Sequence, residues 1–189
     1  MNLWDLDGTI YDGEITFDFF LFCLKQKKSL IRYFPVIIFT LLMYKLGFMP
    51  IEKLEIAASY LTSAFVKYQV DFNELADEFW ANHKHKLKPI ILSMIEPDHG
   101  ISTSSPEFLI NPIKSLLKAK VIICTEFDTK KGIVLFANFG KNKVISFKKR
   151  FPGVKINNFY TDNPKSDAPL IEIAKRAFLV KGDNFTKIK

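Results

Sequence analysis

From Pro97 onward, short apolar runs alternate with helical segments, and this alternation constrains the fold more than any other feature of the sequence. We expect strands over residues 101–103, 121–124, 133–136, 156–161 and 178–180. We expect helices over residues 106–117, 143–151 and 168–176, and a hairpin turn over 128–132. Strands that alternate with helices at this spacing favour a parallel sheet covered by helices on both faces.

The first residues of the chain belong to the same sheet, because residues 2–7 have the pattern of a short buried strand that ends in a Gly-Thr turn. The pattern from about Glu14 to Ile95 is instead helical. The fold class that follows is α/β, with a three-layer Rossmann-like core over residues 1–11 and 98–189. An all-helical cap is expected as an insertion over residues 12–97.

Apolar side chains recur at helical spacing within the cap. Three groups carry this pattern: Phe17, Phe20, Leu21 and Leu24; Leu54, Ala57, Ala58 and Leu61; and Phe72, Leu75, Phe79 and Trp80. Asp71 stands directly before the third group, where an aspartate is a favoured N-cap. We therefore expect three or four helices that pack on one another.

Composition and charge restrict the function classes. The 189 residues carry a net charge of +7, and 48% of them are hydrophobic, which excludes a disordered chain. The middle segment, residues 12–97, has ten acidic and ten basic side chains, so the whole excess lies outside it. The lysine-rich clusters have no signature of a nucleic-acid-binding fold, and we expect no nucleic-acid partner.

The cysteine count and the first residues indicate a compartment. Two cysteines, Cys23 and Cys124, cannot form a disulfide framework, which favours a reducing environment. Asp5 and Asp7 stand where a secretory leader would be apolar, so no leader is expected. We expect a cytoplasmic protein.

One apolar run raises the question of a membrane. Residues 33–44 are 12 uncharged residues between Arg32 and Lys45. Spanning a bilayer takes about 20 apolar residues, so a buried cap helix is the favoured interpretation. Because tyrosine and basic residues flank the run, a peripheral membrane contact through the cap stays open.

Two carboxylates, Asp5 and Asp7, follow the first strand, and Gly8 and Thr9 complete the turn. Ligands bind at this end of an open parallel sheet. Two such close anions repel each other unless a cation lies between them, and Mg²⁺ prefers oxygen ligands. Gly8 allows the backbone to turn sharply and leave both carboxylates facing the crevice.

Further polar residues follow later strands. Residues 102–106 offer hydroxyls and backbone N–H groups after the second core strand, an arrangement that suits an anion. Lys143 opens a helix, where a cation gains nothing from the helix dipole. Asp162 and Asp167 follow the strand over 156–161. Together these residues predict two carboxylate pairs, hydroxyls and a lysine at one edge of the sheet.

This ordered set resembles the haloacid dehalogenase superfamily, in its phosphoserine-phosphatase-like branch with a helical cap between the first two motifs. Residues 4–10 are similar to its first motif, Thr103 stands at the second-motif hydroxyl, and Lys143 matches the third-motif lysine. Residues 160–167 resemble the fourth, acidic motif, although its two acids are five residues apart rather than four.

The resemblance implies a Mg²⁺-dependent hydrolysis of a small phosphorylated metabolite through an aspartyl-phosphate. It gives catalytic roles to Asp5 as nucleophile, Asp7 as acid and base, Thr103 and Lys143. It implies a metal site of Asp5, Asp7, Asp162 and Asp167, and substrate contacts from Glu14, Thr103, Ser104 and Lys143. Glu14 has two interpretations: a ligand for a substrate amine, or a carboxylate that complements a helix dipole.

Two other functions remain open at this point. A lipid-phosphate phosphatase at a membrane surface would explain the apolar run over 33–44. A catalytically silent binding protein of the same fold is the other alternative, although the acidic and basic set is intact.

Overall fold

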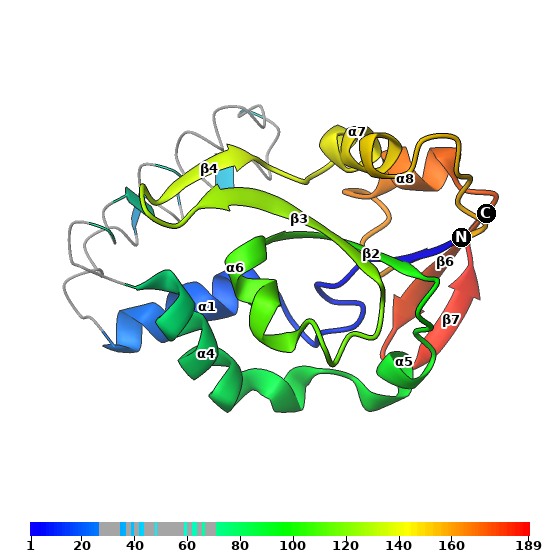
Figure 1. Ribbon diagram of the computed structural model, residues 1–189. Helices are drawn as coiled ribbons and strands as arrows, with labels where there is room; N and C mark the ends of the chain where they lie inside the picture. Colours follow the sequence, from blue (N-terminus) through cyan, green and yellow to red (C-terminus); the bar gives the residue numbers. More distant parts are fainter. Residues whose placement is uncertain are drawn as a thin grey trace.

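A computed structural model gives the fold of the protein (Figure 1). It describes residues 1–26 and 71–189 and ten positions between them: Pro35, Val36, Phe39, Leu42, Met43, Phe48, Ser59, Thr62, Ser63 and Val66. The helix expected around Leu54–Leu61 and most of the apolar run over 33–44 lie outside the described residues.

Seven strands form one sheet in the order β4-β3-β2-β1-β5-β6-β7. Their bounds are β1 (Asn2–Trp4), β2 (Gly100–Pro106), β3 (Val121–Asp128), β4 (Ile133–Phe136), β5 (Asn158–Thr161), β6 (Arg176–Lys181) and β7 (Asn184–Lys187). The five inner strands are parallel, as predicted, and the two edge strands β4 and β7 are antiparallel to their neighbours. β7 was not expected from the sequence.

The central strand β1 determines where a ligand can bind. β2 pairs with one side of β1 and β5 with the other. The order in which the chain adds strands to the sheet therefore reverses at β1. In open α/β sheets the crevice at such a switch point, at the carboxyl ends of the strands, is where ligands bind. Asp5 directly follows β1 and therefore stands at this crevice.

Helices cover both faces of the sheet, which confirms the three-layer α/β fold (Figure 1). α7 (Lys141–Arg150) and α8 (Ala168–Ile173) lie on one face, where Leu3 and Phe147 share a buried cluster. α1 (Ile15–Gln26), α4 (Phe72–His83) and α6 (Glu107–Ile110) contribute to the core on the other face, together with Trp4. Leu3 and Trp4 point to opposite faces because side chains alternate along a strand.

The helix expected over residues 106–117 is much shorter. α6 ends at Ile110 and continues only as a 3₁₀ helix, η3 (Asn111–Ile113). Pro112 has no backbone N–H and cannot extend an α-helix, which is the physical reason for the difference.

The cap helices α1 and α4 are confirmed, but the apolar pattern expected for α1 matches its core-facing side only in part, through Phe20 and Leu24. Its buried residues are Ile15, Phe19, Phe22 and Cys23, whereas Phe17 is 39% exposed. In α4, Asp71 is the N-cap, as predicted, and accepts a hydrogen bond from Asn73 N at 2.8 Å. Phe79 of α4 packs edge-on against Phe19 and Phe22.

Two linkers connect these helices to the core, and they are hydrogen-bonded to each other. Asp12 N donates to Lys86 O at 2.8 Å, and Lys88 N donates to Ile10 O at 2.9 Å. The return linker contains the 3₁₀ helix η2 (Lys84–Lys86) and leads into α5 (Pro89–Ser93). The division into a core over 1–11 and 98–189 and a cap over 12–97 stays a prediction.

Among the described residues, no helix has both the length and the apolar character needed to cross a membrane.

Candidate active site

Four side chains from three parts of the chain meet beyond the carboxyl end of β1. Lys143 Nζ donates to Asp5 Oδ1 at 2.7 Å and to Asp167 Oδ1 at 2.7 Å. Thr161, the last residue of β5, donates from its hydroxyl to Asp167 Oδ2 at 2.7 Å. All four residues are buried. The structure thus brings together the residues predicted from the first, third and fourth motifs.

Lys143 reaches this position from the first turn of α7. The helix begins after Gly140, whose φ of +52° favours glycine, and Lys143 is its third residue. Burial alone would lower the pKa of Lys143, but the adjacent Asp5 and Asp167 carboxylates outweigh it and raise the pKa. The ammonium therefore stays charged although it is buried.

Asp7 is held by three hydrogen-bond donors. Ile15 N, at the start of α1, donates to Asp7 Oδ1 at 2.7 Å, and Thr103 Oγ1 donates to Oδ2 at 2.8 Å. Ser105 Oγ lies 3.3 and 3.2 Å from the two carboxyl oxygens. Burial raises the pKa of Asp7, while these hydrogen bonds oppose the rise. Such a carboxyl can exchange a proton more readily near neutral pH than an exposed aspartate.

Thr9 connects the two acidic segments. Its hydroxyl lies 3.4 Å from Asp5 Oδ2, a weak hydrogen bond, and accepts from Asp162 N at 2.9 Å. The Asp162 carboxylate lies directly over Gly8, since a Cβ at Gly8 would come within 2.0 Å of Asp162 Oδ2. The glycine predicted for a sharp turn is thus also required for the close approach of Asp162.

The donor set fits a divalent cation. Burial raises the pKa of Asp5 well above its ordinary value, and the charges of Asp167 and Asp7 add to the rise, while Lys143 opposes it. Burial also raises the pKa of Asp162, and Asp167 again adds to it. One lysine therefore faces an excess of buried carboxylates, and oxygen ligands of this kind suit Mg²⁺.

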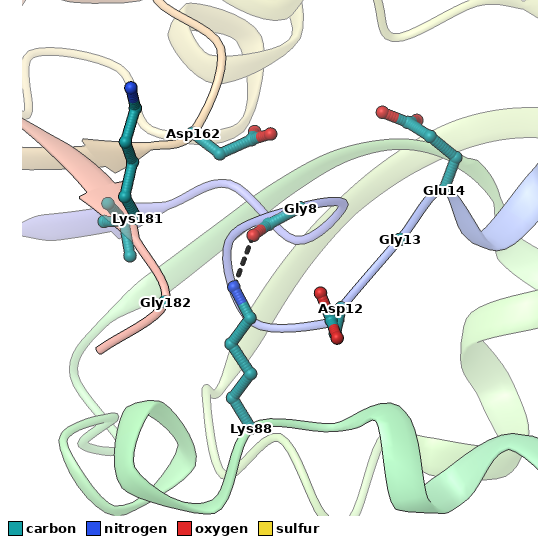
Figure 2. Close-up of a pocket in the computed structure, with 9 residues that line it drawn as sticks. Gly8, Asp12, Gly13, Glu14, Lys88, Asp162, Lys181 and Gly182 are labelled. Carbon is teal, nitrogen blue, oxygen red and sulfur yellow. Dashed lines mark hydrogen bonds between the residues drawn. The ribbon is translucent and has the colours of Figure 1, made fainter. Parts of the chain in front are cut away.

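A pocket of about 430 Å³ opens beside these carboxylates (Figure 2). Its lining comes from the turn after β1, both cap linkers, the loop after β5 and the end of β6: Gly8, Asp12, Gly13, Glu14, Lys88, Asp162, Val180, Lys181 and Gly182. Figure 2 shows the carboxyl groups of Glu14 and Asp162 pointing toward the same space. The pocket offers room for the leaving group of a substrate.

Glu14 directly precedes α1, and its carbonyl accepts from Asp18 N at 2.8 Å. Although Glu14 is an exposed residue, partial desolvation of its carboxyl and the charges of Asp7 and Asp162 raise its pKa to about 7. The carboxyl therefore faces the acidic centre from the pocket side. Its predicted role as a substrate contact stays a prediction.

A second group of potential ligands lies at the opposite, amino end of β2. Glu96, Asp98 and His99 have ligand atoms within 4.8 Å of one another. His99 Nδ1, however, accepts from Trp4 Nε1 at 3.1 Å and from Glu96 N at 3.2 Å, so it carries no proton. Nε2 lies 3.0 Å from Asn2 Nδ2, so both ring nitrogens already contact protein groups.

Comparison with known proteins decides the family. The family model of the haloacid dehalogenase-like hydrolases matches residues 3–172, which include most of the chain and every site residue predicted from the sequence. The chain belongs to the haloacid dehalogenase-like hydrolase family. No curated protein sequence matches it.

Several solved structures share the fold of this haloacid dehalogenase-like hydrolase. A protein of unknown function from Bordetella pertussis Tohama I has a TM-score of 0.74 at 18% identity, over 94% of this chain and 87% of that one. A phosphoserine phosphohydrolase-like protein from Francisella tularensis subsp. tularensis SCHU S4 has a TM-score of 0.56 at 13% identity, over 94% and 86%. A phosphoserine phosphatase from T. onnurineus has a TM-score of 0.59 at 16% identity, over 94% of this chain and 81% of that one.

The second-motif segment differs from the sequence-based expectation in one respect. Thr103 was predicted to contact the phosphoryl group, and here its hydroxyl donates to Asp7, as does that of Ser105, which was not predicted. The predicted substrate contact Ser104 accepts, through its carbonyl, from Thr125 Oγ1 at 2.6 Å, and its side-chain role stays a prediction. Residues two apart on a strand share a face, and this rule could have identified Ser105.

Three further residues support the site without having been predicted. Lys88 Nζ donates to Gly8 O at 2.6 Å from the return linker (Figure 2). Thr9 joins Asp5 to the loop of Asp162, as described above. Asn138 is fully buried and donates from Nδ2 to Thr103 O at 2.9 Å. Lys88 and Asn138 bond to backbone groups that are far away in sequence, and no spacing rule identifies such contacts.

Proposed function

We propose that the protein is a Mg²⁺-dependent phosphomonoester hydrolase that works through an aspartyl-phosphate on Asp5. The observation that carries this proposal is the contact of Lys143 Nζ with Asp5 Oδ1, 2.7 Å, beside the buried Asp7 carboxyl. A nucleophilic carboxylate, a group that can give and take a proton, and a fixed cation for the phosphoryl oxygens are what this chemistry needs.

The first half of the reaction uses Asp5 and Asp7. An Asp5 carboxylate oxygen attacks phosphorus and forms a P–O bond, while the bond between phosphorus and the leaving oxygen breaks. Asp7 gives its proton to that oxygen, so the product alcohol leaves neutral. Lys143 holds the phosphoryl oxygens as their charge redistributes, and the Thr103 hydroxyl, which donates to Asp7 in this structure, would turn to the phosphoryl group.

The second half returns both carboxyls to their starting state. Asp7, now a carboxylate, takes a proton from a water molecule that attacks phosphorus. The bond between phosphorus and Asp5 breaks, which releases inorganic phosphate and regenerates the Asp5 carboxylate. Asp167 acts through Lys143, because both of its oxygens already accept hydrogen bonds, from Lys143 and Thr161.

Mg²⁺ would be held by Asp5, the backbone carbonyl of Asp7 and Asp162, and it would reduce the repulsion between carboxylate and phosphate. Asp162 is well placed for this, since it lies over the turn that carries the Asp7 carbonyl.

We infer a small phosphorylated metabolite as the substrate, because the pocket beside Glu14 and Lys88 has a volume of about 430 Å³. The phosphoserine phosphatase names of two structures with the same fold support this substrate class. Phosphate release from a panel of phosphorylated metabolites, with and without Mg²⁺, tests the proposal. Turnover of any of them excludes a silent binding protein, and binding without turnover would favour that alternative.

A lipid phosphate at a membrane surface is a second candidate substrate. Between residues 36 and 48, four described residues present large apolar side chains to solvent: Val36 (43% exposed), Phe39 (60%), Leu42 (50%) and Phe48 (72%). Residues 25–51 contain five basic and no acidic side chains, which suits an anionic lipid surface. Co-sedimentation with anionic vesicles, lost in Phe39→Asp, would support this candidate, and no binding to vesicles would remove it.

A further inference from the structure

Ser105 lies between the Asp7 carboxyl and the first turn of α1. Its hydroxyl is 3.2 Å from Asp7 Oδ2, 3.3 Å from Asp7 Oδ1 and 3.2 Å from Thr16 Oγ1. The residue is fully buried. Its backbone N–H donates to Thr103 Oγ1 at 3.0 Å, so the two hydroxyls that contact Asp7 are fixed to each other.

The three donors to Asp7 come from different parts of the chain and differ in kind. Ile15 N–H can only donate, and it therefore favours the carboxylate. A hydroxyl can donate or accept. The Ser105 hydroxyl also has a second hydroxyl partner, Thr16, and either of these two oxygens can be the donor.

These contacts fix the plane of the Asp7 carboxyl. Ile15 N donates to Oδ1, Thr103 Oγ1 donates to Oδ2, and the Ser105 hydroxyl lies within hydrogen-bond distance of both oxygens. Thr16 Oγ1, 3.2 Å from Ser105 Oγ, in turn restricts the rotation of the Ser105 hydroxyl.

We propose that Ser105 is a positioning residue that holds Asp7 in the orientation from which it protonates the leaving oxygen, with Thr16 as the partner that holds the Ser105 hydroxyl. The inference rests on the proposed function, since it assigns Asp7 the acid and base role. Thr16 belongs to a helix of the cap side and Ser105 to β2 of the core, so the two parts of the chain jointly fix the acid.

Two substrates separate this role from a merely structural one. The nitrophenolate of para-nitrophenyl phosphate leaves readily without a proton, whereas a primary alkyl phosphate needs one. We expect Ser105→Ala to lower kcat/KM for the alkyl phosphate by about tenfold or more, as for the loss of a hydrogen bond to a charged group. The same variant should lower kcat/KM for the aryl phosphate by less than about threefold, because that step makes little use of the acid.

Ser102→Ala is the matched control. Ser102 is another fully buried serine of β2, and its hydroxyl accepts from Asn138 Nδ2 at 3.1 Å rather than contacting Asp7. Its removal should affect both substrates equally. An equal loss on both substrates in Ser105→Ala as well would overturn the inference, because it would indicate a general structural effect.

Two more variants keep the test decisive if Ser105→Ala folds poorly. Thr16→Val removes the second hydroxyl at an exposed position and should show the same preference for the aryl substrate, with a smaller loss. Ser105→Thr keeps the hydroxyl and should restore turnover of the alkyl phosphate. The inference is wrong if Thr16→Val shows the wild-type ratio of kcat/KM for the two substrates and Ser105→Thr selectively loses turnover of the alkyl phosphate.

Asp7→Asn, measured in parallel, distinguishes a failure of the proposed function from a failure of the inference about Ser105. If Asp7→Asn fails to show a larger loss on the alkyl phosphate, the proposed role of Asp7 is wrong and the inference falls with it. If Asp7→Asn shows that pattern and Ser105→Ala does not, only the inference about Ser105 is wrong.

Discussion

Lys143 Nζ lies 2.7 Å from Asp5 Oδ1, although the two residues are 138 positions apart in sequence. The same ammonium contacts Asp167, so a single buried cation holds two carboxylates from different strand ends. Breaking a buried ion pair from one side leaves uncompensated charge, which makes this contact important for both activity and stability.

Lys143→Ala should weaken the binding of vanadate, a mimic of the transferred phosphoryl group, by at least about tenfold. The folded protein should also lose about 3 kcal/mol or more of stability, because Asp5 and Asp167 lose their partner. Lys141→Ala, which removes an exposed lysine from the same helix, should change neither quantity appreciably. Unchanged vanadate affinity in Lys143→Ala would remove Lys143 from the phosphoryl site.

Gly8→Ala should abolish productive Mg²⁺ binding. The added Cβ would meet Asp162 Oδ2 at 2.0 Å, and the φ of +70° costs a non-glycine residue about 1–2 kcal/mol. Gly153→Ala is the control: its φ is +76°, and a Cβ there has nothing within 4 Å. Both variants should lose similar backbone stability, but only Gly8→Ala should lose Mg²⁺ affinity in calorimetry. Normal affinity would show that Asp162 does not depend on its place over Gly8.

Glu14→Gln separates the two interpretations of Glu14. A contact with a substrate amine predicts a large rise in KM for an amino phosphate and little change for a neutral aryl phosphate. A helix-start role predicts no dependence on substrate and at most about 1 kcal/mol of lost stability. Because Glu14 lines the pocket and faces the acidic centre, we expect the first result. Equal kinetics on both substrates would contradict it.

The stability of the metal-free protein should fall as pH rises. Glu14 has its pKa raised from 4.5 to about 7, so the folded state binds a proton that the unfolded state has already lost. The stabilisation is present below the unfolded pKa and disappears through the folded pKa. Thermal unfolding in chelator should therefore show a Tm that decreases between about pH 5 and pH 8, and the decrease should be smaller in Glu14→Gln. The same slope in both proteins would contradict the assigned shift.

The convergence of the site was predictable because it follows from topology. Residues after parallel strands meet at one edge, and this rule alone places Asp5 and Asp162 together. Asp71 was predictable for a different reason, because an N-cap depends on the local sequence only.

Other features depended on contacts that the sequence does not encode locally. Almost every residue from Phe17 to Leu24 is apolar, so periodicity could not select the buried face of α1. β7 contains one apolar residue, Phe185, and becomes a strand because β6 offers an unpaired edge. Ser105 was missed because the strand was expected to end at residue 103, whereas β2 continues to Pro106.

Phosphate release by wild type and by Asp5→Asn, in Mg²⁺ and with any phosphomonoester that the wild type hydrolyses, tests the central claim most directly. Loss of the nucleophile should reduce kcat by several orders of magnitude, about 10⁴-fold or more, while the thermal unfolding profile remains that of a folded protein. Turnover by folded Asp5→Asn at more than about 5% of the wild-type kcat would contradict Asp5 as the nucleophile and, with it, the aspartyl-phosphate mechanism.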